Sequence, residues 1–590
     1  MWYATHRSQG IGSDRRSAQS GVTLMDALVG SAVMVVVFVG FFAAFQLSID
    51  IILNNRSRAG AIALANERME YMHSLAYDSV GTVGGIPSGS VAQSEAISLN
   101  NINYTRRTIV QYKDDPKDGL GASDINSVTE DYKSVKVDVS WVSRSGVRDI
   151  VLVSRVSPTS GVESLVPGGT LFLTTIDAHG QPFGGASVSI TNASISPAVN
   201  INTFSNINGT LTILGAPGAT GYHIVVTEPG YSTDQTYAAT AQNTSPNPGN
   251  LTVVNYQTTS GTFAIDVLGS KTVNTWTQIL SGTWTDPFND ETKIATSSNT
   301  SISGGEASLI GPDPYSAIGE VQSIAIAPSY LNAWKSLAIS DSQPASTTII
   351  YHVYDGGGTT LIPDAQLPGN AAGFSAGPIN LAGISTSTYP SIRLDASFST
   401  TDASSTPTLS SWSVDYTYGP QPLGNIAFTM QGVKTIGSGP SGTIYKYASN
   451  LSTNSSGTLA IPSLEWDTYM ISVGSGTGYD VASACNPQPE SLAPGTAQTT
   501  NLYLTAHTTN SLLVDVRSAL DSSLVAGASV TLSQGAFTAT STTDACGQSF
   551  FKGLTADPSY SVSVTAAGHT PYSATPINIS GTSQLSVPLN

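Results

Sequence analysis

The sequence predicts a multidomain protein in which a long N-terminal transmembrane α-helix and a small antiparallel sheet precede all-β sandwich modules. Residues 27–49 are uncharged and mostly apolar. From about residue 160 onward, Ser, Thr, Asn and Gly are dense, and short runs alternate between apolar and polar residues. Alternation with a period of two is typical of half-buried strands. The 590 residues are too many for one hydrophobic core, so we expect several domains.

The uncharged stretch over residues 27–49 is long enough to span a bilayer as a helix. Three arginines precede it: Arg7, Arg15 and Arg16. Positive charge on that side predicts a cytoplasmic N-terminus and an exported remainder. A secretory leader would instead have a shorter apolar region, followed by small residues at its cleavage site.

The helical pattern continues beyond the apolar stretch. Apolar residues recur at steps of three and four until about Ala76, and a glycine-rich segment from Gly81 then ends the pattern. We therefore expect a helix over residues 24–77, with its first half in lipid and its second half packed on a small sheet. His73 lies on this helix without a second metal-ligating residue at ligand spacing, which favours a structural role.

The residues just before the apolar stretch read SGVTLMD, from Ser20 to Asp26. This segment resembles the type IV prepilin leader, in which Gly precedes a short apolar tetrapeptide and an acidic residue. The resemblance implies that prepilin peptidase cuts after Gly21 and that Val22 becomes an N-methylated N-terminus. Asp26 then takes the fifth mature position, where the family usually carries Glu.

An acidic residue at the end of a membrane helix has a physical rationale in such a protein. A carboxylate there is costly unless it is paired, and in a pilus Asp26 can face the α-amine of a neighbouring Val22. Asp is one methylene shorter than Glu, which weakens the expected pairing. The alternative is a plain signal anchor in which the Gly and the Asp occur by chance.

A small antiparallel sheet is expected after the helix, within a unit spanning residues 22–158. Residues 104–112, 134–141 and 148–156 alternate as strands, and a Ser-Gly turn at 145–146 joins the last two into a hairpin. The pattern DYK…V.VSW followed by this hairpin resembles the PilV-type minor pilin group, also called type IV pilus modification protein.

Several aspartates cluster between the second and third of these segments. They are Asp114, Asp115, Asp118 and Asp124, with Asp131 further along. Calcium takes six to eight oxygen ligands, which such a loop can offer. The spacing does not match an EF-hand, and Asp with Gly and Pro also forms turns for backbone reasons alone. Calcium is the only cofactor that the sequence suggests.

Three later segments share one order of strands, turns and Gly-led strands. They cover residues 169–257, 424–505 and 508–590, and the first and last contain the motif Gly-Ala-Ser-Val. This order resembles the carboxypeptidase regulatory-like domain, a small immunoglobulin-like β-sandwich. The resemblance implies passive spacer or adhesive modules.

A longer block over residues 259–418 separates the first two copies. Its strand density suggests a jelly-roll sandwich similar to galactose-binding-like domains. The block contains four tryptophans: Trp276, Trp284, Trp334 and Trp412. Aromatic faces with polar edges suit surface glycans, whereas tryptophan in a sandwich is more often part of the core.

Cys485 and Cys546 are the only cysteines. In an exported protein without other thiols, they are expected to form a disulfide if the fold brings them together. Such a bond would join the last two sandwiches.

Composition and motifs narrow the function. A net charge of −17 argues against nucleic-acid binding, which needs a Lys/Arg footprint. The seven histidines lie singly, and no Gly-Lys-Ser/Thr phosphate loop occurs. The carboxylates of Asp286 and Asp290 could serve a glycosidase, although the segment between them reads more simply as a loop. We therefore expect no enzyme.

The predicted function is a type IV minor pilin or pseudopilin that displays extracellular β modules for adhesion or pilus modification. The expected partners are prepilin peptidase, other pilin subunits, the cytoplasmic membrane and surface glycans. The chain would cross the membrane once before assembly and lie at the cell surface afterwards. The alternatives are a membrane-anchored adhesin outside any pilus and a carbohydrate-binding or carbohydrate-active protein on a pilin stalk.

Overall fold

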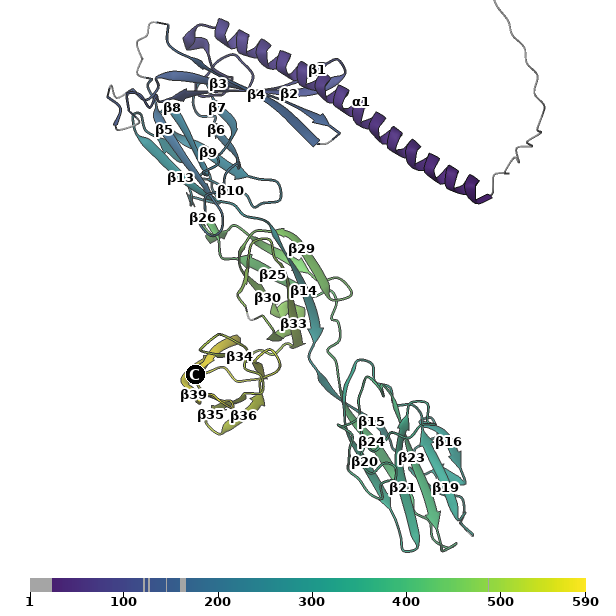
Figure 1. Ribbon diagram of the computed structural model, residues 1–590. Coiled ribbons are helices and arrows are strands. Elements are labelled where there is room, and N and C mark those ends of the chain that lie inside the picture. The colour runs from purple at the N-terminus through teal and green to yellow at the C-terminus, as the bar shows by residue number, and fades with distance from the viewer. Residues whose placement is uncertain are drawn as a thin grey trace, which may run out of the picture.

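The computed structural model describes residues 24–119, 123–125, 128–144, 146–159, 166–312, 314–486 and 488–590. It confirms the predicted fold class, because one long apolar helix precedes a chain of β-sheet modules (Figure 1). The modules follow one another away from the helix and form an elongated arm. Gly21 and Val22 lie outside the described residues, as does the side chain of Asp26.

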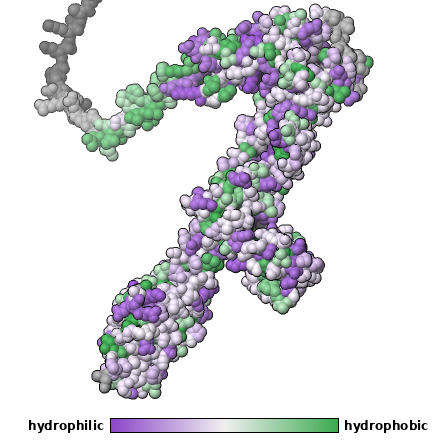
Figure 2. Space-filling view, turned by 180° about the vertical axis from the view of Figure 1, so that it is seen from behind, coloured by the Kyte–Doolittle hydropathy of each residue, from purple (hydrophilic) through white to green (hydrophobic). Residues whose placement is uncertain are grey.

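Helix α1 (Leu24–Ser74) is long and apolar enough to cross a membrane, and its most apolar 18-residue window is 0% buried. Figure 2 shows this end of the helix as an apolar rod that projects from the rest of the molecule. The second half packs on a sheet through Ala61, Leu64, Ala65 and Met72. The predicted division of the helix into a free apolar half and a packed half is therefore present.

The head consists of the packed half of α1 and a four-stranded antiparallel sheet in the order β1-β2-β3-β4. Val135, Val137 and Val139 alternate along β3 and point toward the helix, so their period of two builds the core. The 3₁₀ helix η1 (Tyr77–Ser79) follows α1. The strands are β1 (Ser94–Leu99), β2 (Ile102–Lys113), β3 (Tyr132–Ser143) and β4 (Gly146–Val156).

The first sandwich contains the sheets β10-β9-β6-β7, with β12 beside β9, and β13-β5-β8. Its core includes Leu173, Ile190, Tyr222 and Phe263. The two-residue strand β11 lies outside these two sheets and pairs with β26. The strands are β5 (Gly169–Ile176), β6 (Ser187–Asn192), β7 (Val199–Phe204), β8 (Thr210–Ala216), β9 (Ala219–Thr227), β10 (Asp234–Gln235), β11 (Ser245–Pro246), β12 (Leu251–Val253) and β13 (Thr258–Ala264).

The second sandwich combines β14 with strands that come about 150 residues later, in the sheets β29-β14-β33-β31 and β28-β25-β30-β32. A short 3₁₀ helix, η3 (Ser475–Thr477), precedes β31. The strands are β14 (Gly269–Thr277), β25 (Ala427–Gly432), β26 (Thr435–Gly439), β27 (Gly442–Tyr445), β28 (Ala448–Ser452), β29 (Thr458–Leu464), β30 (Asp467–Ser472), β31 (Tyr479–Ala484), β32 (Glu490–Leu492) and β33 (Ala497–Ala506).

An inserted domain lies between β14 and β25 and points away from the second sandwich (Figure 1). Its sheets are β17-β18-β24-β20-β22, with β15 beside β24, and β16-β19-β23-β21. The strands are β15 (Leu280–Asp286), β16 (Ile294–Ser298), β17 (Thr300–Ser303), β18 (Glu306–Leu309), β19 (Ile318–Ser323), β20 (Leu331–Ser342), β21 (Thr347–Asp355), β22 (Ile379–Asn380), β23 (Ile392–Thr400) and β24 (Thr408–Tyr418).

The C-terminal sandwich has the sheets β37-β34-β40 and β36-β35-β38-β39. In all three sandwiches the first strand pairs in parallel with the last: β5 with β13, β14 with β33, and β34 with β40. The strands are β34 (Ser511–Ser518), β35 (Ser529–Gln534), β36 (Phe537–Thr542), β37 (Gln548–Lys552), β38 (Asp557–Thr565), β39 (Tyr572–Ile579) and β40 (Thr582–Leu589).

Strand pairing shows that the first sandwich ends, and the second sandwich begins, inside the block expected over residues 259–418. Strand β13 completes the first sandwich by pairing with β5, and β14 opens the second by pairing with β29 and β33. The pairing that assigns each strand to a module joins residues far apart in the chain, so local composition does not mark the boundary. The inserted domain itself begins at β15 and ends at β24.

Candidate functional site

The head holds the helix against its sheet by a buried charge network. The Arg106 guanidinium donates to Glu95 Oε2 at 2.8 Å and to the Leu64 carbonyl of α1 at 3.1 Å. Arg68, also on α1, reaches the same Glu95 oxygen at 2.6 Å. Burial raises the pKa of Glu95, but the hydrogen bonds from Arg106 and Arg68 outweigh it and hold that pKa below its ordinary value. The network ties the helix to β1 and β2.

A buried lysine binds backbone carbonyls just after the end of the helix. Lys133 on β3 is 2% exposed and donates to the backbone carbonyls of Tyr77 and Val80 at 2.7 and 2.9 Å. Burial lowers the pKa of Lys133 to about 8. Its ammonium group thus satisfies carbonyls where the chain leaves α1. His73 contacts Ser154 Oγ at 2.8 Å, in keeping with the structural role expected for it.

The aspartates of the predicted calcium loop separate into two groups. Carboxylate oxygens of Asp114, Asp118 and Asp131 lie within 4.8 Å of one another. Asp115 turns instead to Arg155, whose Nη1 lies 2.9 Å from Asp115 Oδ2, and this contact lowers the pKa of Asp115. Asp124 is 7% exposed and is not a member of that group of three. Calcium binding by this loop stays a prediction.

The joint between the head and the first sandwich is made by backbone and amide groups. The Asn200 amide donates to the Gly84 carbonyl at 2.8 Å, and Gln93 Nε2 donates to the Asn200 carbonyl at 2.5 Å. Ile86 from the head is buried in the core of the first sandwich. The head and the first sandwich therefore share both polar and apolar contacts.

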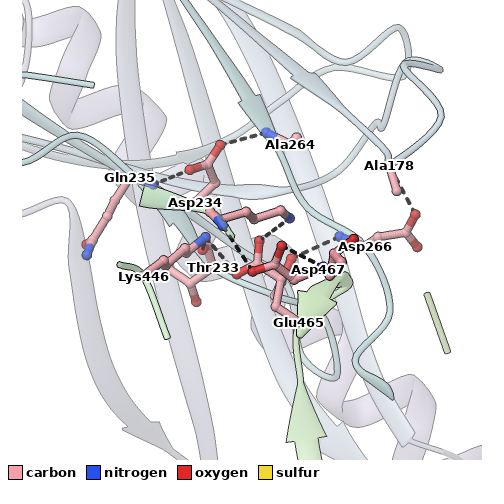
Figure 3. Close-up of polar contacts among 12 residues, drawn as sticks. Ala178, Thr233, Asp234, Gln235, Ala264, Asp266, Lys446, Glu465 and Asp467 are labelled. Carbon is pink, nitrogen blue, oxygen red and sulfur yellow. Dashed lines mark hydrogen bonds and ion pairs between the residues drawn. The ribbon is translucent and has the colours of Figure 1, made fainter. Parts of the chain in front are cut away.

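The joint between the first and second sandwiches includes shared strand pairing. Strand β11 of the first pairs with β26 of the second. Figure 3 shows the adjoining polar contacts, in which Lys446 reaches the Thr233 carbonyl at 2.7 Å and Glu465 at 2.7 Å. Lys434 binds the other oxygen of Glu465 at 2.8 Å. A cavity of about 320 Å³ lies at this joint, beside these charged groups.

The second and C-terminal sandwiches are joined covalently. Cys485 and Cys546 form the disulfide expected from the sequence, with Cα atoms 4.3 Å apart. Beside it, the Ala484 amide donates to Gln548 Oε1 at 2.6 Å, so a hydrogen bond also crosses the joint. The bond links the end of β31 to the turn before β37.

The tryptophans expected in the longer block have different surroundings. Trp334 and Trp412 are 0% and 1% exposed and form the core of the inserted domain. Trp284 is partly buried against that core, with Lys293 Nζ 5.7 Å from its ring. Trp276 belongs to β14 of the second sandwich instead of the block. The buried pair supports the core interpretation for these two residues.

The carboxylates of Asp286 and Asp290 both organise their own loop. Asp286 Oδ1 accepts from the Phe288 amide, and Asp290 Oδ1 accepts from the Thr292 amide, each at 2.9 Å. Burial raises the pKa of Asp286, and the hydrogen bonds from Thr292 lower that of Asp290. These contacts fit the loop interpretation made from the sequence.

No local sequence pattern predicts the polar groups at the joints, including Gln93, Lys446 and Glu465. Their partners lie far away in the chain, as with Lys446 and Thr233, which are separated by 213 positions. No local pattern marks such residues. Among the contacts at the joints, only the disulfide could be expected from the sequence, because two cysteines without other thiols in an exported chain are expected to pair.

Comparison with known proteins identifies no family. No family model and no curated protein matches this chain. Among solved structures, the TIE protein of Bacillus anthracis is 11% identical, with 85% of this chain and 74% of that chain covered and a TM-score of 0.15. BcpA, the major pilin subunit of Bacillus cereus, is 10% identical, with 72% and 99% covered and a TM-score of 0.13. The RrgB pilus protein of Streptococcus pneumoniae is 9% identical, with 72% and 98% covered and a TM-score of 0.12.

Such low TM-scores carry no argument about this chain. Within the described residues, the structure defines one N-terminal helix that is long and apolar enough to cross a membrane, followed by an arm of β modules.

Proposed function

We propose that this chain is a type IV pilus minor pilin or pseudopilin of the PilV type, which carries its β modules out from the filament. The observation that carries the proposal is the division of α1. The most apolar window of its first half is 0% buried, and Arg144 of the head contacts this half only near its end, at Gln46 and Asp50; the second half is packed into the core of a four-stranded sheet. A helix built this way can lie in a membrane first and in a bundle of like helices afterwards, with the head unchanged.

The arm supports a display role. The modules are joined end to end by strand pairing, polar contacts and a disulfide, so the distal domains are held away from the head. The inserted domain and the C-terminal sandwich both leave the second sandwich and form a fork (Figure 1). Adhesion through this fork, with surface glycans as ligands, belongs to the proposal, as does the absence of catalysis.

Processing and assembly complete the proposal. Prepilin peptidase would cut after Gly21, and Val22 would be N-methylated. In the membrane the chain would be a single-pass protein, and after assembly it would lie at the cell surface among other pilin subunits. Asp26 would pair with the α-amine of a neighbouring subunit.

Shearing of surface filaments from producing cells tests this assignment. We expect the processed chain in the sheared fraction, together with the major filament subunit. Asp26→Asn should remain processed but be depleted from that fraction, whereas the matched variant Asp26→Glu should be retained, because only the carboxylate can pair with the amine. A processed chain found solely in membranes would contradict assembly and favour a membrane-anchored adhesin.

A further inference from the structure

The second sandwich buries a lysine between its two sheets. Lys271 lies on β14, and its side chain is 0% exposed. Burial lowers the pKa of Lys271, and the hydrogen bond to Glu490 offsets this only in part. Desolvation of an amine favours its neutral form, and the neutral form is the nucleophile.

A carboxylate lies next to this amine. Glu490 on β32, in the opposite sheet, places Oε2 2.5 Å from Lys271 Nζ. The same oxygen accepts from Thr500 Oγ1 at 2.6 Å, and Oε1 accepts from Asn486 Nδ2 at 2.7 Å. These bonds hold the carboxylate where it can take a proton from Nζ and pass it to another group in the same site.

A carboxamide lies on the other side of the amine. Strand β33 runs parallel to β14, and Gln498 is in register with Lys271. Lys271 Nζ donates to Gln498 Oε1 at 2.8 Å. The amide carbon of Gln498 is one C–O bond, about 1.2 Å, beyond that oxygen. Nucleophile, proton-transfer group and electrophile therefore meet in one site, held by neighbouring strands.

We propose that the second sandwich is a site of covalent self-modification, in which Lys271 and Gln498 form an intramolecular amide with Glu490 as the proton-transfer group. Glu490 takes a proton from the Lys271 ammonium, and the neutral amine attacks Gln498 Cδ. The tetrahedral intermediate collapses as Glu490 gives this proton to the departing amide nitrogen, and Glu490 then takes the second proton from the nitrogen of the new amide, so that the departing ammonia finally carries it away as ammonium. One C–N bond forms, one C–N bond breaks, and ammonia leaves; no oxidant, reductant or cofactor takes part.

The bond would join the first strand of the module to its last. The inserted domain leaves the module at the end of β14, and the C-terminal sandwich follows β33. A covalent link between these two strands lies at the base of the fork, where a pull on either distal domain would otherwise separate β14 from β33. The inference rests on this module alone and holds whether or not the chain enters a filament.

Mass spectrometry of the purified, reduced and denatured full-length chain tests the proposal without any variant. We expect an intact mass lower by one ammonia than the sum of the residues present. Digestion should give a branched peptide that contains both Lys271 and Gln498. Lys133, a second buried lysine, donates to backbone carbonyls and should keep its free amine. Unbranched peptides with a free Lys271 amine and an intact Gln498 amide would overturn the proposal.

Variants assign the roles. Gln498→Met keeps the side-chain length but removes the carbonyl, and Glu490→Gln removes the proton acceptor; both should abolish the loss of ammonia. Lys434→Met, which breaks the ion pair with Glu465 in the same module, should retain it. On a denaturing gel the chain without substitutions, which carries the cross-link, should migrate faster than Gln498→Met, because the ring from residue 271 to 498 restricts the denatured chain. Loss of ammonia retained in Gln498→Met would refute Gln498 as the electrophile.

Discussion

The head and the arm are stabilised in different ways. In the head, helix and sheet share one apolar core and one buried charge network, so neither is complete without the other. In the arm, each module has its own core, and the joints consist of strand pairing, ion pairs and a disulfide. The head should therefore respond to damage as a unit, whereas a broken joint in the arm should leave its modules folded.

The largest expected effect is the loss of Arg106. Its side chain is 7% exposed and bonds two glutamates and a carbonyl of α1. Arg106→Met should destabilise the head by about 1–3 kcal/mol, because the Leu64 carbonyl loses its donor and Glu95 keeps only Arg68 as a partner. Hydrogen exchange measured by mass spectrometry should show faster exchange over β2 and β3 and no change in the arm. Arg107→Met, on the exposed side of β2, is the control. If Arg106→Met also raised exchange in the C-terminal sandwich, the head and the arm would not respond independently.

Removal of the disulfide should act on orientation instead of folding. In Cys485→Ser/Cys546→Ser we expect a broader distribution of distances between spin labels on the second and C-terminal sandwiches. Core exchange in both modules should stay within about 0.5 kcal/mol of the unchanged chain, since each retains its own core. Unfolding of the C-terminal sandwich would show instead that the bond holds the module together.

Acid should weaken the head before the arm. The pKa of Glu95 is lower in the folded state than its ordinary value near 4.5 in the unfolded state. The stability that Glu95 contributes is therefore fully present at a pH above the unfolded pKa. It is lost as the pH falls through the folded pKa. Denaturation followed by exchange over β1 and β2 should show this loss below about pH 4.5. In Arg106→Met the same decline should be smaller, and an equal decline in both would exclude Glu95 as its source.

Calcium should have the smallest effect. If Asp114, Asp118 and Asp131 bind the ion, added calcium should slow exchange over residues 114–119 and 128–131, and a chelator should reverse the change. Asp118→Asn should abolish the response, whereas Asp115→Asn should retain it, because Asp115 pairs with Arg155. If calcium does not slow exchange in the chain without substitutions, the three aspartates form a turn and do not bind calcium.

The helix and the strands of the head could be predicted because their signals are local. The predicted helix over 24–77 ends within a few residues of Ser74, and the alternation in residues 134–141 and 148–156 gave β3 and β4. The period of apolar residues reports which side of an element is buried, and it needs no distant partner.

The arm could be predicted only in outline. Strands β13 and β14 follow one another in the chain but belong to different sandwiches, because β13 pairs with β5 and β14 with β33. Register between strands more than two hundred residues apart leaves no local pattern. For the same reason, the group of Lys271, Glu490 and Gln498 could not be found from spacing.

The mass of the mature N-terminus tests the central assignment most directly. We expect a mature chain that begins with N-methylated Val22, as cleavage after Gly21 and methylation would leave it. A retained Met1, or an N-terminus created by a cut after residue 49, would contradict the assignment as a type IV pilin.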